Sequence, residues 1–105
     1  MTLNDIQKQV DDWTSNLKLG YWKPHEILAR LMEETGELSR EINHIYGPKK
    51  KKSSEQTEGM EDEIGDIIFT LCCLANSHKI DLDVVFKRVM DKLNNRDKDR
   101  WEKKV

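Results

Sequence analysis

Apolar residues recur at alternating three- and four-residue steps in four separate stretches of this chain, which is the spacing of helices that bury one face. The first stretch predicts a helix from about Leu3 to Leu17. The second predicts a helix that starts at Pro24, a residue suited to a first helical turn, and stops at Gly47-Pro48. No stretch shows the two-residue alternation of a convincing β-strand. The pattern therefore predicts an all-α fold.

The second half of the chain repeats this organisation. A third helix is expected to begin near Gly59 or Met60 and to end at His78, and Asp81 is a suitable N-cap for a fourth. Residues 47–58 lack periodicity and predict a mobile loop.

The four segments fit one domain covering residues 1–105, with a charged tail from about residue 94 that is expected to extend or fray the last helix. We expect a four-helix bundle. Four short helices cannot bury all their apolar faces alone, so a homodimer or homotetramer is expected to complete the fold.

Charge is distributed unevenly along the chain although the net charge is only −2. Acidic residues concentrate at 33–41 and 58–66, and basic residues at 49–52 and 87–104. This balance does not predict binding to nucleic acid or to an anionic membrane. The N-terminus lacks a run of signal-peptide length, and no stretch has the roughly 20 apolar residues of a membrane span. A cytoplasmic protein is expected.

Cysteine and nucleophile chemistry is not indicated. Cys72 and Cys73 are adjacent in an apolar helical stretch, where a mutual disulfide would be strained, so both are interpreted as reduced packing residues. His25 and His78 lie near helix ends and are interpreted as structural. The sequence has no P-loop, no serine or cysteine nucleophile arrangement and no groove-reading DNA motif.

Two acidic pairs with the same spacing are the strongest candidate for a functional site. Glu34 and Glu37 on the second predicted helix correspond to Glu63 and Asp66 on the third. Each pair lies to one side of its helix's apolar stripe, so packing of the two stripes in an antiparallel hairpin can bring all four carboxylates to one edge of the core.

Four converging carboxylates repel one another and lose hydration unless a cation neutralises them. Oxygen ligands without histidine or thiolate favour Mg²⁺, Mn²⁺ or Ca²⁺. Gly36 and Gly65, costly in helix interiors, are interpreted as admitting close helix approach or a ligand. For the other acids of these segments a solvated helix face is the simpler interpretation; these acids are Glu33, Glu41, Glu61 and Asp62.

These residues resemble the MazG-like family of all-α nucleoside triphosphate pyrophosphohydrolases. The resemblance lies in ExxE at Glu34 and Glu37 followed by ExxD at Glu63 and Asp66, in the surrounding LARLMEETGELSREI and EDEIGDIIF, and in the charged tail. It implies the fold of all-α NTP pyrophosphatases and hydrolysis of an NTP to NMP and pyrophosphate. It also implies that the four acids hold Mg²⁺, with Mn²⁺ as a substitute. Glu33 or Glu37 could orient or deprotonate the attacking water.

The resemblance also suggests substrate-binding residues. Lys92, Asn95 and Lys98, with Arg100, resemble the basic and amide residues that relatives place after the fourth helix, although their spacing departs from the commonest pattern. Trp13 is a candidate for stacking on the base, but its place on the first apolar stripe favours core packing.

The sequence leaves two alternative roles for each of two further aromatic residues and for one loop. Trp22 and Trp101 could stack on the base or cover a subunit interface. Lys49–Lys52 could close over a polyphosphate, but a solvated loop is the preferred interpretation because the segment has no hydrophobic anchor.

Two other functions compete with the enzyme. The first is a non-catalytic helical interaction or regulatory protein that retains a carboxylate metal site. The second is a carboxylate-bridged redox bundle, which is disfavoured because di-iron sites require a Glu-x-x-His motif on each of two helices, whereas this chain has one such sequence, Glu41 to His44. Release of pyrophosphate from an NTP would separate the enzyme from both.

Overall fold

The computed structural model describes residues 1–52 and 59–104. Within these ranges it contains four α-helices and no strand, which confirms the all-α prediction; the helices are α1 (Leu3–Thr14), α2 (Pro24–Tyr46), α3 (Met60–Ser77) and α4 (Leu82–Asn95). The mobile loop predicted at 47–58 lies in part, at 53–58, outside the described residues.

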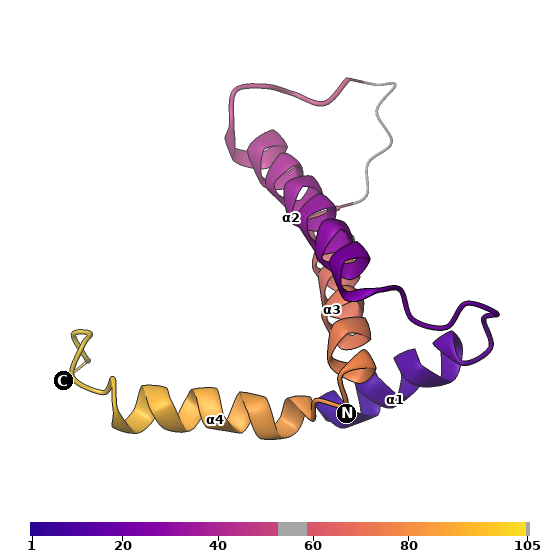
Figure 1. Ribbon diagram of the computed structural model, residues 1–105. Coiled ribbons are helices and arrows are strands. Elements are labelled where there is room, and N and C mark those ends of the chain that lie inside the picture. Colours follow the sequence, from indigo (N-terminus) through magenta and orange to yellow (C-terminus); the bar gives the residue numbers. More distant parts are fainter. Residues whose placement is uncertain (53–58, 105) are drawn as a thin grey trace.

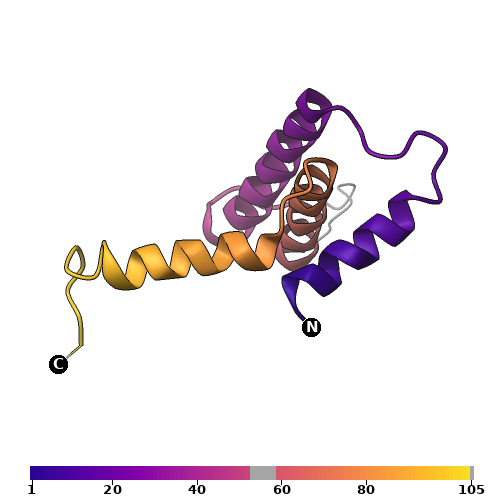
Figure 2. The same cartoon turned by 60° about the horizontal axis from the view of Figure 1, so that its bottom comes forward.

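An antiparallel hairpin of α2 and α3 forms the centre of the molecule (Figure 1). α1 packs against α3 near the base of this hairpin, and α4 contacts α1 and then extends away from it (Figure 2). The buried apolar core is small and consists of Val10, Ile27, Cys72 and Ala75. The hairpin places the two acidic segments side by side, as the sequence predicts.

α1 is shorter than predicted, because it ends at Thr14 and not at Leu17. The chain turns there through short-range hydrogen bonds, such as the one from Leu17 N to the Thr14 carbonyl (3.0 Å). Gly20 then adopts φ +65°, a left-handed conformation that glycine accepts without steric cost. This turn returns Tyr21 to the surface of α1 and α3.

The N-termini of α1 and α4 cap one another. The Asp83 carboxylate of α4 accepts hydrogen bonds from the backbone amides of Leu3 (3.1 Å) and Asn4 (3.3 Å), two donors that have no partner within α1. Asp81 caps α4, as predicted, by accepting from Val84 N (3.2 Å), and it also accepts from the Asn4 side chain (2.9 Å). These bonds fix where α4 leaves the molecule.

The buried side chain of Gln7, which the sequence pattern did not predict to be buried, connects α1 to α3 through hydrogen bonds. Gln7 Nε2 donates to Asn76 Oδ1 (2.9 Å) and to the Ile80 carbonyl (2.8 Å). Asn76 in turn donates to the Gln7 carbonyl (2.9 Å) and to the Tyr21 hydroxyl (2.9 Å), which donates to Asp11 (2.6 Å). A polar network in which each member has partners rigidifies the packing around it.

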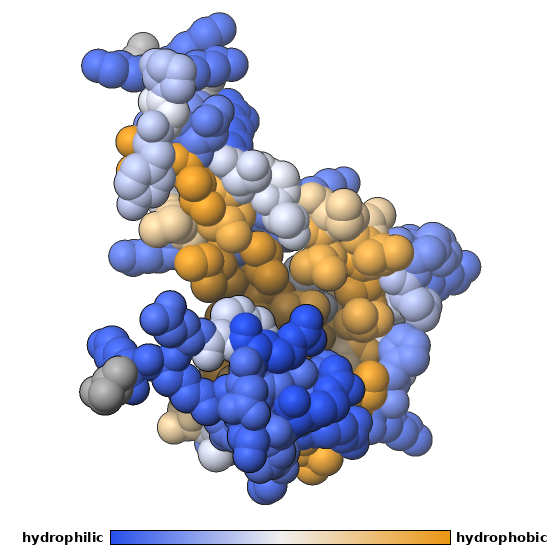
Figure 3. Space-filling model, turned by 90° about the vertical axis from the view of Figure 1, so that its left-hand side faces the viewer, coloured by the Kyte–Doolittle hydropathy of each residue, from blue (hydrophilic) through white to orange (hydrophobic). Residues whose placement is uncertain are grey.

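Much apolar surface remains exposed in a single chain. α4 contributes no buried residue, and Val84, Phe86 and Val89 on it are 44–56% exposed. Figure 3 shows apolar side chains gathered around a hollow above the end of α4. The radius of gyration is 17.4 Å, whereas a compact domain of about 100 residues has about 13 Å. No helix of the described part is both long and apolar enough to cross a membrane.

Candidate active site

Three carboxylates converge on the edge of the α2–α3 hairpin. One oxygen each of Glu34, Glu37 and Glu63 lies within 4.8 Å of the other two. Glu34 and Glu63 are only 2% and 4% exposed, whereas Glu37 is open to solvent. The helical spacing therefore brings together acids that are far apart in the sequence, and it buries two of them.

A cavity of about 390 Å³ opens beside these carboxylates. Asp66 lines it together with Glu34, Glu37 and Glu63, so all four acids of the two motifs face one space. Glu33 is exposed and does not line the cavity. Of the two residues considered as a base, only Glu37 faces this space.

The Glu34 carboxylate lies in an environment that disfavours its charge. Burial raises its pKa above the usual range, and the charges of Glu37 and Asp66 raise it further, whereas Arg30 lowers it. Its Oε2 is buried and receives no hydrogen bond from the described residues. The adjacent Glu63 could share a hydrogen bond with it only if one carboxyl kept a proton. With all its acids ionised, the site holds more negative charge than Arg30 and Arg40, which also line it, can balance.

Arg30 is a site residue that the sequence argument missed. Its Nε lies 2.6 Å from Glu34 Oε1, and its side chain lines the cavity. The signal was present, because Arg30 and Glu34 are four residues apart on one helix and such residues face each other. The pair leaves the second oxygen of Glu34 available for a ligand.

Glu41 and Lys51 add an ion pair at the rim of the same cavity. Glu41 is 8% exposed, so the expectation of a solvated side chain was wrong. Lys51 Nζ donates to Glu41 Oε2 at 2.5 Å, and the lysine is itself partly buried. The solvated-loop interpretation is therefore wrong for Lys51, although Lys49, Lys50 and Lys52 are exposed.

The glycines of the two motifs do not permit close helix packing within one chain. A Cβ atom added at Gly36 or at Gly65 would meet nothing within 4 Å. The expectation of close helix approach is therefore wrong inside the protomer. Access for a ligand or for another molecule remains a prediction for these positions.

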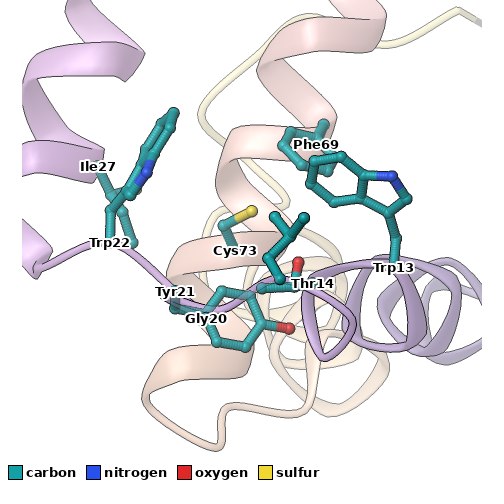
Figure 4. Close-up of a pocket in the computed structure, with 9 residues that line it drawn as sticks. Trp13, Thr14, Gly20, Tyr21, Trp22, Ile27, Phe69 and Cys73 are labelled. Carbon is teal, nitrogen blue, oxygen red and sulfur yellow. The ribbon is translucent and has the colours of Figure 1, made fainter.

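An aromatic pocket of about 90 Å³ lies between α1, the turn after it and α3 (Figure 4). Trp13 and Phe69 meet edge to face, with ring centroids 5.6 Å apart and planes at 78°. Trp22 lies on the opposite side of the pocket, and Cys73 lies between. Trp13 is 56% exposed, so the core-packing interpretation of this residue was wrong.

Both cysteines are free thiols, as predicted. Cys72 is buried as a packing residue, whereas Cys73 lines the aromatic pocket. Burial raises the pKa of Cys73 to about 11, so it stays a neutral thiol near pH 7. A nucleophilic role for this cysteine is therefore not supported.

A second, smaller space of about 60 Å³ joins the aromatic pocket to the carboxylate cavity. It shares Trp22, Ile27, Phe69 and Cys73 with the aromatic pocket, and Arg30, Glu34 and Asp66 with the carboxylate cavity. Ile27 and Glu34 on α2, like Cys73 and Asp66 on α3, are seven residues apart, which corresponds to about 10 Å along each helix. One continuous groove thus runs from aromatic rings to acids.

The residues predicted to bind phosphate lie elsewhere. Lys92 and Asn95 are on the last turns of α4 and Lys98 follows that helix; none of them lines the carboxylate cavity of its own chain. Trp101 and Lys98 line a separate shallow depression beside the buried Asp97. Of the residues considered for substrate binding, Trp13 and Trp22 line the groove.

Comparison with known proteins shows the family of this chain. Residues 23–101 match the model of the MazG nucleotide pyrophosphohydrolase domain. The chain is 53% identical to YpjD of Bacillus subtilis (strain 168) over 103 residues, which cover 98% of this chain and 93% of that protein. It is 31% identical to YvdC of the same organism over 102 residues, covering 91% and 96%.

Two crystal structures share the fold. That of YpjD from Bacillus subtilis has a TM-score of 0.80 at 50% identity and covers 90% of this chain and 97% of its own. That of the Bacillus-conserved MazG protein, a nucleotide pyrophosphohydrolase, has a TM-score of 0.79 at 44% identity and covers 94% and 96%. The chain therefore belongs to the MazG nucleotide pyrophosphohydrolase family, whose members are hydrolases that act on nucleotides.

Proposed function

We propose that this protein hydrolyses a nucleoside triphosphate between the α- and β-phosphates, giving NMP and pyrophosphate, and that it requires Mg²⁺, which Mn²⁺ can replace. Glu34, Glu37, Glu63 and Asp66 would hold the cation. Family membership supports hydrolysis of a nucleotide, and the carboxylate cavity supports the dependence on a cation.

The observation that carries the cation proposal is the convergence of carboxylate oxygens around a buried, unsatisfied atom. Glu34 Oε2 has no donor among the described residues, and three acids offer oxygen atoms within 4.8 Å of one another. An all-oxygen donor set with an open side towards a cavity fits Mg²⁺, which keeps room in its shell for water and phosphate. Among the described residues, those that line the cavity include no histidine or cysteine, the ligands that zinc would favour.

When bound, Mg²⁺ neutralises polyphosphate charge and polarises the phosphoryl group that is attacked. The protein's own residues supply position and charge. Arg30 lines both the groove and the cavity, so its guanidinium can contact a phosphate while it keeps Glu34 in place. Glu37, exposed at the cavity, can accept a hydrogen bond from the attacking water, and we therefore favour it over Glu33 as the orienting base.

The experiment is a product assay with purified protein, Mg²⁺ and the standard ribo- and deoxyribonucleoside triphosphates. Equal amounts of NMP and pyrophosphate are expected, and EDTA should stop the reaction reversibly. Release of orthophosphate would indicate a different hydrolase. Inertness with every nucleotide would favour the non-catalytic interaction protein. Glu37→Gln should lower kcat far more than Glu33→Gln if the assignment of the base is right.

We also propose that the protein acts as a homodimer or homotetramer. The accessible surface is 8763 Å², whereas a compact monomer of 12.4 kDa exposes about 6100 Å². Much of the excess is apolar and lies on α4 and around the hollow above it. If α4 packs against a second copy, Lys92, Asn95 and Lys98 could contact substrate only across that interface.

Light scattering coupled to gel filtration tests this assembly. A mass of two or four times 12.4 kDa is expected for the wild type. Phe86→Glu, on the exposed face of α4, should give monomers. Leu19→Glu is the matched control, because Leu19 is 84% exposed but lies outside α4. A monomeric wild-type protein would refute the proposal.

A further inference from the structure

We propose that the aromatic pocket accepts a single-ring base and that the hydroxyl of Thr14 recognises it, so that pyrimidine nucleoside triphosphates are the substrates. This inference rests on the proposed pyrophosphohydrolase activity and specifies its substrate class. It assigns the pocket in Figure 4 to the base and the carboxylate cavity to the phosphates.

The continuity of the groove supports this assignment. The joining space brings Trp22, Ile27 and Phe69 of the aromatic pocket next to Arg30 and Glu34 of the carboxylate cavity. Aromatic rings bind the face of a base, and acids with a cation bind phosphates. The two ends are therefore chemically suited to the two ends of one nucleotide, and their separation of about 10 Å leaves room for the sugar between them.

The size of the pocket favours one ring over two. It measures about 90 Å³, whereas an apolar cavity of about 150 Å³ is known to enclose benzene. A six-membered ring can enter with one edge towards the open mouth. A fused purine is larger than a single ring, so more of its surface would remain outside a pocket of this volume.

Thr14 carries the hydrogen-bonding group of this pocket. It is only 4% exposed, and its Oγ1 is buried without a hydrogen-bond partner among the described residues. The other helical threonines of the described part differ, because Thr35 donates to the Leu31 carbonyl (2.8 Å) and Thr70 to the Asp66 carbonyl (2.9 Å). A buried hydroxyl that gives up this common bond has a strong need for another partner.

The neighbouring tyrosine does not fill that need. The Thr14 hydroxyl lies close enough to the Tyr21 oxygen to lower the pKa of the tyrosine, but the two groups do not meet the geometry of a hydrogen bond, whereas the tyrosine donates to Asp11 and accepts from Asn76. A hydroxyl can also accept two hydrogen bonds, so Thr14 retains capacity in any orientation. The 2-carbonyl shared by cytosine, uracil and thymine, and absent from adenine, is a suitable acceptor for its proton.

The first test compares kcat/KM for CTP, UTP, ATP and GTP, measured as pyrophosphate release with Mg²⁺. We expect an advantage of about tenfold or more for the pyrimidines, of the size that a pocket of fixed shape with one polar contact provides. Equal or faster hydrolysis of the purine nucleotides would overturn the inference while leaving the proposed function intact.

The second test uses Thr14→Val, which keeps the shape and removes the hydroxyl. The variant should fold at least as well as the wild type, because it removes a buried polar atom without a partner. Its KM for CTP should rise about tenfold with little change in kcat, and Thr14→Ser should restore most of the loss. Thr35→Val is the matched control, since Thr35 is an exposed helical threonine outside the groove.

A binding measurement separates this inference from the activity. Titration of the metal-free protein with CMP and AMP, followed by tryptophan fluorescence, should show tighter binding of CMP and loss of this preference in Thr14→Val. If no nucleotide is hydrolysed but this preference is found, the proposed function fails and the base pocket stands. If CMP and AMP bind alike, or if Thr14→Val binds CMP as the wild type does, the inference is wrong.

Discussion

Replacement of Glu34 by glutamine should stabilise the metal-free protein and weaken its stabilisation by Mg²⁺. Without metal, the environment of Glu34 disfavours its charge, and the upward direction of its pKa already includes the favourable effect of Arg30. Glutamine removes the charge and keeps the shape, and its amide can donate to the adjacent carboxylates. Metal-free Glu34→Gln should therefore unfold at a higher temperature than the metal-free wild type.

With Mg²⁺ the order should change. A ligand that binds only the folded state adds about 1.4 kcal/mol for each tenfold increase in its concentration above Kd. For a domain of this size that corresponds to about 6–11 °C in Tm for each tenfold increase. The wild type should follow this slope. Glu34→Gln, with one buried ligand neutralised, should respond only at much higher concentrations.

The assay is thermal unfolding by circular dichroism over a Mg²⁺ series, at one protein concentration because an oligomer's Tm depends on it. Glu61→Gln is the matched control, since Glu61 is an exposed acid in the first turn of α3 and does not line the cavity. A wild-type Tm that is independent of Mg²⁺ would refute the reasoning. So would a Glu61→Gln variant that loses the response as Glu34→Gln does.

Three further substitutions test separate features. Lys79, just after the end of α3, has a left-handed backbone with φ 55°, which glycine adopts at lower cost than lysine. Lys79→Gly should therefore raise the free energy of unfolding in urea by about 1 kcal/mol, and an unchanged or lower value would contradict this conformation. Gly65→Ala should also raise the free energy of unfolding by about 1 kcal/mol, because alanine favours the helix and its Cβ atom would contact no other atom of the chain. A lower free energy of unfolding would indicate that another molecule packs against this position. Lys51→Ser should lower the free energy of unfolding of the metal-free protein by about 1 kcal/mol, because Glu41 loses its counter-charge. Lys50 is exposed, so Lys50→Ser should leave the free energy of unfolding unchanged. Equal effects of the two substitutions would contradict the ion pair.

The helices were predictable because their signals are local. Pro24 is the first residue of α2, and Asp81 is the N-cap of α4, as predicted. Apolar spacing gave the orientation of the acidic pairs, because side chains three and four residues apart share a helix face. The end of α1 at Thr14 was not predictable in this way, since it depends on the return of Tyr21 to Asp11 and Asn76.

The same distinction between local signals and contacts of distant segments applies to the site. The convergence of Glu34, Glu37 and Glu63 follows from two helical periods and one hairpin, and the sequence contains both. The aromatic pocket requires the path of the turn after α1, which brings Trp22 opposite Phe69. Lys51 reaches Glu41 from the loop, and no periodicity predicts where a loop residue lies.

The two ends of the groove are built in opposite ways, and this difference bears on how the enzyme binds a nucleotide. The aromatic end is fixed before any ligand arrives, because the Tyr21 hydroxyl in its wall is held by Asn76 and Asp11 in the network that joins α1 to α3. The acidic end carries mutual repulsion among its carboxylates, which Arg30 offsets only in part. A rigid pocket for the base loses little entropy on binding and can discriminate by shape. If the acidic end holds a cation, as we propose, it should bind phosphates only when the cation comes with them. Base selection and polyphosphate binding would then be separable functions of one continuous groove.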